Sequence, residues 1–263
     1  MGSRGFKDEF IKNYGIESFF QPEKKGGQKS VHFIVRGGQK QVMKIFDGGK
    51  DQRFEREMKI YEKYKDSGSL PAIYEISEYD GETVVFEEFI NGDTLEDITD
   101  KFKGNVSKIK ELMKSLFTIL TPIWKDKFVH RDIKPANIMI RPDGTPVLLD
   151  FGIARDLGED SITVTGGLQP GTWKWAAPEQ YAGQKDMISY RTDFFSLGVL
   201  AFFLYHNELP FGKKVEDIDA KFKSGDETCL IATDCTLKDF LIEAMRFKPS
   251  HRPKEIEDLA KLI

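Results

Sequence analysis

Strand-like and helix-like patterns are segregated along this chain of 263 residues. Two apolar-rich runs, residues 31–35 and 41–46, flank Gly37-Gly38, and this arrangement predicts a β-hairpin. Residues 72–77 and 82–89 repeat the strand-like composition around a second turn signal. The first third of the chain is therefore expected to be rich in strands.

Helical periodicity occurs once in this first part and dominates the rest of the chain. In residues 51–65, Phe54, Met58 and Tyr61 recur at helical spacing with charged residues between them. Strands followed by helices predict an α+β fold of two lobes, with a boundary near residues 88–91. The helices expected in the second lobe are a short one opened by Thr94 and Leu95, one over residues 106–127 that Pro122 can bend, a nearly all-apolar and therefore buried one over residues 194–205, and two over residues 237–247 and 254–262.

Composition excludes several classes of protein. The chain has 40% apolar residues and 21 phenylalanines, enough to build a core, and its formal net charge of −4 gives no general attraction to nucleic acid. No run approaches the roughly 18 apolar residues of a membrane span, and the start lacks the apolar region of a signal peptide. Cys229 and Cys235 are expected to be reduced. These features predict a cytoplasmic protein with no nucleic-acid or membrane partner.

Three short motifs carry most of the functional information. The chain reads His-Arg-Asp at residues 130–132 with an asparagine at Asn137, then Asp-Phe-Gly at residues 150–152, then Ala-Pro-Glu at residues 177–179. In this order and spacing they resemble the signature set of the eukaryotic-like serine/threonine protein kinases, in a compact bacterial form. The resemblance begins at about Gly26 and extends to the end of the chain, and it implies the bilobal protein kinase fold with a β-rich N-lobe and a helical C-lobe.

The resemblance assigns catalytic roles in transfer of the γ-phosphoryl group of ATP. Asp132 is expected to accept the proton of the substrate hydroxyl, and Lys134 to reach the transferring phosphoryl group. Asn137 and Asp150 are expected to hold Mg²⁺, a cation that prefers oxygen ligands. A lysine at position 134 is also typical of kinases that act on serine and threonine.

The N-lobe is expected to hold the phosphates of ATP. Lys44 occupies the place of the family's strand lysine, and its carboxylate partner is expected to be Glu57, with Glu55 as the competing choice. Glu57 is preferred because Tyr61 lies on the same helical face. The glycine-rich loop departs from the family pattern: of its three glycines only Gly26 remains, with Gly27 added, and their backbone N–H groups are expected to approach phosphate.

The connector at residues 86–92 resembles the kinase hinge. The resemblance implies that backbone groups of Glu88 and Ile90 bond the adenine edge, and it places Glu87 at the gatekeeper position. The residues expected to sandwich the adenine ring are Val31, Val42 and Met139.

Residues 153–176 resemble an activation loop. Thr163 and Thr165 stand in a T-x-T-G pattern seen in bacterial serine/threonine kinases, so autophosphorylation in trans is a hypothesis for them and for Ser161. Arg131 is expected to pair with a phosphorylated loop residue. Thr172 is expected near the substrate, beside Asp132 or Lys134.

Several matches imply structural roles. Asp193 is expected to brace the backbone of residues 130–137, which correspond to the catalytic loop of the family, Arg252 to pair with Glu179, and His130 to pack without acid–base work. Residues 1–20 precede the N-lobe (21–89) and the C-lobe (90–263), and their apolar side chains are expected to pack as an extra helix on the N-lobe.

The sequence thus predicts a serine/threonine protein kinase that uses ATP and Mg²⁺ and acts on proteins presenting serine or threonine. One alternative is a pseudokinase, a nucleotide-binding scaffold or allosteric module, which the reduced glycine loop favours and the presence of Lys44, Asp132, Asn137 and Asp150 disfavours. A second is a small-molecule kinase of the aminoglycoside or choline type, which the Ala-Pro-Glu segment disfavours.

Overall fold

The computed structural model describes residues 5–25, 29–47, 51–152, 154–157, 172–227 and 236–263. Within these ranges the chain forms two compact units, Met1–Asn91 and Gly92–Ile263. The first is built on a β-sheet and the second mainly from helices, which confirms the predicted α+β class.

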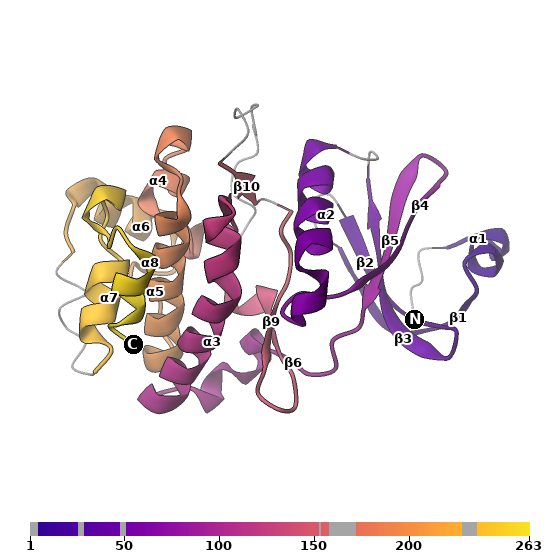
Figure 1. Ribbon diagram of the computed structural model, residues 1–263, viewed down its shortest axis with the longest axis horizontal. Coiled ribbons are helices and arrows are strands. Elements are labelled where there is room, and N and C mark those ends of the chain that lie inside the picture. The colour runs from indigo at the N-terminus through magenta and orange to yellow at the C-terminus, as the bar shows by residue number, and fades with distance from the viewer. Residues whose placement is uncertain (1–4, 26–28, 48–50, 153, 158–171, 228–235) are drawn as a thin grey trace. The chain divides into compact units, whose positions relative to one another are not determined.

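Unit 1 is built on one antiparallel sheet of five strands (Figure 1). Two tight turns join neighbouring strands, and each has positive φ at both central residues: Gly37 and Gly38 in one, Asp80 and Gly81 in the other. This is the geometry that matches the twist of a two-residue hairpin, so both predicted turns are confirmed. In spatial order the strands are β1 (Ile16–Lys25), β2 (Lys29–Arg36), β3 (Gln39–Phe46), β5 (Glu82–Glu88) and β4 (Ile73–Tyr79).

Strand β3 is buried on both faces, because successive side chains of a strand point to opposite sides of the sheet. On one face, Phe46 packs edge-to-face on Phe54 of helix α2 (Gln52–Tyr64), with ring centroids 5.1 Å apart. The side chain of Asp51 caps this helix by accepting a hydrogen bond from the N–H of Phe54. Lys44 points to the same face as Phe46, so the lysine predicted to bind phosphate lies beneath α2.

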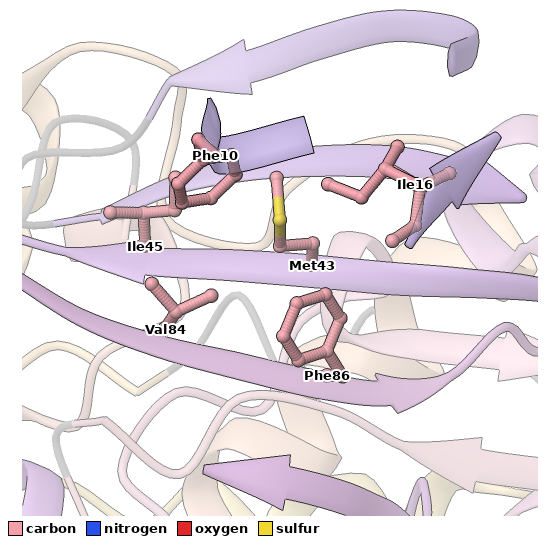
Figure 2. Close-up of a cluster of buried hydrophobic side chains, with 7 residues drawn as sticks. Phe10, Ile16, Met43, Ile45, Val84 and Phe86 are labelled. Atoms are coloured by element: carbon pink, nitrogen blue, oxygen red, sulfur yellow. The ribbon is translucent and has the colours of Figure 1, made fainter. Parts of the chain in front are cut away.

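The other face of the sheet is covered by the N-terminal residues. Phe10 of helix α1 (Asp8–Asn13) packs into a buried cluster with Met43, Phe86 and other apolar side chains of the sheet (Figure 2). Figure 1 shows α1 and α2 on opposite sides of this sheet. The cluster consists of Phe10, Ile16, Ile34, Met43, Ile45, Val84 and Phe86.

The prediction of a single extra helix for the N-terminal residues is wrong beyond Tyr14. The helix ends at Asn13, and from Ile16 onward the chain is strand β1, paired with β2 in three irregular register steps. Pro22 lies inside β1, which is tolerated because β1 is an edge strand and needs no N–H on its outer side. The irregular pairing gives β1 no clean alternation of apolar and polar residues, so the sequence carries no clear strand signal.

Unit 2 is organised around helix α5 (Tyr190–His206), which is buried along most of its length, as predicted. Ser189 and Thr192 form a capping box at its start, and Asn207 ends it in the left-handed conformation. At Gly198 a side chain would meet the Cγ of Met245 at 2.5 Å, so this glycine allows the helix to pack closely on its neighbour.

Helices surround α5 and short strands lie beside them (Figure 1). Within the described ranges, none of the helices combines the length and the apolar character that crossing a membrane requires. The strands of unit 2 are β6 (Asp93–Thr94), β7 (Phe128–Val129), β8 (Ile138–Ile140), β9 (Pro146–Leu148) and β10 (Arg155–Asp156). The other α-helices are α3 (Val106–Lys125), α4 (Pro178–Tyr181), α6 (Val215–Ser224), α7 (Lys238–Ala244) and α8 (Ile256–Ala260). Short 3-10 helices include Leu95–Lys101, Pro135–Asn137 and Thr172–Lys174.

Replacing Phe10 tests whether the N-terminal helix belongs to the folded unit. We expect Phe10→Ala to lower the free energy of unfolding by about 3–5 kcal/mol, because it empties a fully packed site. Urea denaturation measures this, and Glu9→Ala on the same helix, at an exposed position, is the matched control. Equal stability of the two variants would show that α1 is an appendage.

Candidate active site

The carboxylate of Asp132 is the centre of a buried polar cluster in unit 2. Its Oδ2 accepts hydrogen bonds from Lys134 Nζ at 2.9 Å and from Asn137 Nδ2 at 2.8 Å. Its Oδ1 is buried and has no hydrogen-bond partner among the residues that the structure describes. Buried carboxylate oxygens are normally satisfied, so this oxygen is left for a group that the chain itself does not supply.

Burial raises the pKa of Asp132 above its ordinary value of 3.8. The positive charge and the hydrogen bond of Lys134 oppose this effect and lower the pKa, and the amide of Asn137 acts in the same direction. Asp132 is thus a carboxylate whose affinity for a proton is increased by its surroundings, as a proton acceptor in catalysis requires.

The backbone of the catalytic loop is held in an unusual conformation at Arg131. This residue has φ of 70°, which is uncommon for a side chain other than glycine and costs free energy. Asp193 Oδ1 accepts from the N–H of Arg131 at 2.8 Å, and Gln180 Nε2 donates to its carbonyl at 2.7 Å. Hydrogen bonds on both sides of the residue therefore stabilise a backbone conformation that the loop would not adopt alone.

Asp193, in the first turn of α5, has two further donors. Its Oδ2 accepts from the N–H of His130 and from Nε1 of Trp124, each at 2.8 Å. The predicted role of Asp193 as a brace for the loop is confirmed. Burial raises the pKa of this carboxyl group, while its hydrogen-bond donors act against that shift.

His130 links the loop to the segment around Asp150. The N–H of Asp132 donates to His130 Nδ1 at 3.1 Å, so that nitrogen carries no proton, and Nε2 must be the atom that donates to the carbonyl of Leu149 at 3.1 Å. The ring is therefore neutral, in agreement with complete burial, which lowers its pKa. It also contacts the ring of Phe151, with centroids 4.5 Å apart. These contacts support the predicted packing role of His130.

Asn137 and Asp150 offer oxygen ligands for a divalent cation. Asn137 Nδ2 is bound to Asp132, so the amide oxygen is the atom available for a metal. Asp150 has φ of 62° and accepts a hydrogen bond from the N–H of Gly152, while the N–H of Leu149 donates to the carbonyl of Asn137 at 2.8 Å. In the described ranges no group of three or more His, Cys, Asp or Glu side chains could hold a metal ion. One amide and one carboxylate fit a cation that takes its other ligands from phosphate and water.

In unit 1, Lys44 is buried next to Glu87. The distance from Lys44 Nζ to Glu87 Oε2 is 2.7 Å. Glu57, the predicted partner of Lys44, is also buried, and its Oε1 lies 3.9 Å from Lys29 Nζ. Tyr61, one turn after Glu57 on α2, places its ring centroid 5.9 Å from Lys44 Nζ. Pairing of Lys44 with Glu57 stays a prediction, and Glu87 is a neighbour that the sequence analysis did not assign to Lys44.

The residues predicted to contact adenine come from both units. In unit 1, Val42 lies opposite Glu87 in the β3–β5 ladder, and Val31 lies opposite Lys44 in the β2–β3 ladder. The N–H of Glu88 donates to the carbonyl of Ala72 at 2.8 Å. The backbone group of Glu88 that is left for the predicted adenine contact is therefore its carbonyl. Ile90 is buried just after β5, and Met139 belongs to β8 of unit 2.

Several predicted residues lie outside the described ranges. Gly26 and Gly27, the two glycines of the predicted glycine-rich loop, belong to this group. Thr172 begins a 3-10 helix, and its side chain is outside the description. The remaining residues are Ser161, Thr163 and Thr165 of the predicted activation loop, and Cys229 and Cys235.

The Ala-Pro-Glu segment is anchored by a fully buried ion pair. Arg252 Nη1 and Nη2 bind the two carboxylate oxygens of Glu179 at 2.6 and 2.8 Å, which confirms the predicted pair. The other three N–H groups of Arg252 donate to backbone carbonyls, and Thr192 donates to Glu179 at 2.9 Å. Every donor of the guanidinium is therefore used.

Two contributors to the loop were missed by the sequence analysis. Gln180 and Trp124 contact the catalytic loop or its brace from other elements, α4 and α3. Neither lies in a chemically distinctive motif of its own. Only the position of Gln180, directly after the Ala-Pro-Glu motif, could have pointed to it.

Comparison with known proteins agrees with this geometry. Residues 31–261 match the protein kinase domain family, so the chain belongs to the protein kinase family.

Among the curated relatives, the chain is particularly similar to serine/threonine-protein kinases of bacteria. It is 32% identical over 185 residues to PknA of Nostoc sp., a region that is 66% of this chain and 31% of that protein. It is 27% identical to PrkC of Bacillus subtilis over 79% of this chain and 32% of that protein. It is 28% identical to serine/threonine-protein kinase D of Synechocystis sp. over 80% of this chain and 41% of that protein. The chain thus spans about a third of the length of the first two of these relatives.

The buried ion pair gives a direct test of this anchoring. We expect Arg252→Ala to lower the free energy of unfolding by about 3–5 kcal/mol, because it leaves the Glu179 carboxylate buried and unpaired. Chemical denaturation measures the loss. Lys254→Ala, two residues away and exposed, should change stability by less than about 0.5 kcal/mol. Similar values for the two variants would contradict an anchoring role.

Proposed function

We propose that this chain is a serine/threonine protein kinase that transfers the γ-phosphoryl group of ATP to hydroxyl groups of other proteins. The observation that carries the proposal is the arrangement around Asp132. One of its oxygens is fixed by Lys134 and Asn137, and the other is buried and without a hydrogen-bond partner in the described part of the chain. A substrate hydroxyl is the kind of donor that this oxygen lacks.

In the proposed reaction, Asp132 orients the substrate hydroxyl and receives its proton. As the hydroxyl oxygen bonds to the γ-phosphorus, the bond from that phosphorus to the bridging oxygen breaks, and ADP leaves with the electron pair. Lys134, held 2.9 Å from Asp132, offsets negative charge on the transferring group. Asn137 and Asp150 would hold Mg²⁺, which neutralises phosphate charge when bound.

The residues of unit 1 would bind the rest of the nucleotide. Lys44 is the proposed ligand of the α- and β-phosphates, together with the backbone of Gly26 and Gly27. The buried position of Lys44 beside α2 supports this assignment, since a lysine on an exposed strand edge would be solvated. The proposed adenine site is formed by Val31, Val42 and Met139 with backbone groups of Glu88 and Ile90.

Serine and threonine are the proposed acceptors for two reasons. Lys134 is the residue typical of such kinases, and the bacterial relatives are named serine/threonine-protein kinases. We also propose that the enzyme phosphorylates its own Thr163 or Thr165 in trans. Because ATP is a cytoplasmic substrate, we place the activity in the cytoplasm.

The first test replaces the proposed proton acceptor. With radiolabelled ATP, Mg²⁺ and a generic basic protein, we expect Asp132→Asn to lower the rate of labelling about 100- to 10,000-fold, because an amide cannot accept the proton. Asp143→Asn is the control, since Asp143 is an exposed turn residue of the same unit. Label mapped to Thr163 or Thr165 would support autophosphorylation. Equal labelling by wild type and Asp132→Asn would refute the proposal.

The second test is the pH dependence of kcat/KM. The reaction needs ionised Asp132, and burial raises its pKa, so activity should fall as pH drops through a value above 3.8. Lys134 lowers this pKa, so Lys134→Gln should move the acidic limb to higher pH as well as reduce the rate. An acidic limb that stays in place in this variant would mean that another group controls it.

A further inference from the structure

Glu87 is an acidic side chain buried where the sheet meets the hinge. Only 4% of the residue is exposed, and 7% of Lys44. The Glu87 Oε2 atom is buried and lies 2.7 Å from Lys44 Nζ, in an orientation outside hydrogen-bond geometry. The two side chains therefore form a buried ion pair held by charge and by position.

Sheet register fixes this pair. In the β3–β5 ladder, Lys44 lies opposite Val85 and Glu87 lies opposite Val42. Because side chains alternate along a strand, Glu87 shares a face with Val85 and is a diagonal neighbour of Lys44. The backbone hydrogen bonds of the sheet thus bring the two charges together without help from another element.

Glu57 is placed differently, because it belongs to helix α2. A helix packed on a sheet through side chains alone can shift relative to it, whereas two paired strands cannot change register without breaking their ladder. A carboxylate on β5 stays beside Lys44 whatever the position of α2. Glu57 Oε1 also lies 3.9 Å from a different cation, Lys29 Nζ.

A buried ammonium group needs a nearby carboxylate to remain charged. Burial favours the neutral amine, and an opposite charge within about 4 Å restores the protonated form. Among the described residues of unit 1, Glu87 from β5 and Tyr61 from α2 lie next to Lys44, and Glu57, its predicted partner, is buried on α2 with Lys29 of β2 at 3.9 Å. Of the two carboxylates, Glu87 is the one fixed to the lysine's own sheet.

We infer that Glu87 is a positioning residue for nucleotide binding, which keeps Lys44 charged and in place for the phosphates independently of α2. The inference rests on the proposed function, in which Lys44 contacts the α- and β-phosphates. It gives the gatekeeper position of this chain an electrostatic role in addition to any steric one.

Binding of a non-hydrolysable ATP analogue with Mg²⁺ tests this assignment without any need for phosphoryl transfer. We expect Glu87→Gln to weaken binding about tenfold, because the buried ammonium of Lys44 loses the opposite charge beside it. Glu78→Gln, a control at an exposed position on β4, should bind like wild type. Glu87→Asp, which keeps the charge, should restore part of the affinity. Unchanged or tighter binding by Glu87→Gln would overturn the inference.

Glu57→Gln provides a second test in which Glu87 is intact, so it decides the question even if Glu87→Gln does not fold. We expect this variant to bind the analogue within about threefold of wild type while it transfers phosphate more slowly. Affinity as low as that of Lys44→Met would mean that α2, not the sheet, holds the lysine.

If wild type binds the analogue but transfers no phosphate to any protein, the proposed function fails while the binding series still decides the role of Glu87. If wild type does not bind the analogue, both fail.

Discussion

The carboxylate of Asp193 is the interaction on which the site in unit 2 depends. It binds two consecutive backbone N–H groups of the catalytic loop and the indole of Trp124. Because Asp193 lies on the buried helix α5, the loop takes its position from the core and not from its own sequence. The strained backbone at Arg131 is tolerated for this reason, and Asp132 then projects beside Lys134 and Asn137.

A chain of buried contacts extends this support. The neutral ring of His130 connects the loop to Leu149 and Phe151, next to Asp150. The Arg252–Glu179 pair fixes the start of helix α4, from which Gln180 reaches the carbonyl of Arg131. Two residues with positive φ, Arg131 and Asp150, and two carboxyl groups with a raised pKa, Asp132 and Asp193, lie in the same small region. Each is unfavourable by itself, and the surrounding packing compensates for them, a common arrangement where function requires strain.

The sequence allowed prediction of the parts that have a local signal. Hairpin turns, the amphipathic helix α2 and the buried helix α5 have clear periodicity, and the motifs around Asp132, Asp150 and Glu179 have distinctive spacing. Strand β1 was not predicted, because its irregular pairing leaves its sequence without the apolar and polar alternation that identifies strands. The neighbour of Lys44 was also not predicted, since the diagonal approach of Glu87 depends on strand register, which no single strand contains. Gln180 and Trp124 were missed because their roles arise from tertiary packing.

The apolar contact between the N-terminal residues and the sheet has a consequence for handling the protein. The family match begins at residue 31, yet Phe10 and Ile16 cover a face of the sheet that includes Met43 and Phe86. A chain shortened to the matched region would expose that face and leave β2 as a bare edge strand, ready to pair with other molecules. Such a fragment would retain the motifs assigned to catalysis and yet be prone to aggregation, so its poor solubility would say nothing about the chemistry of the site.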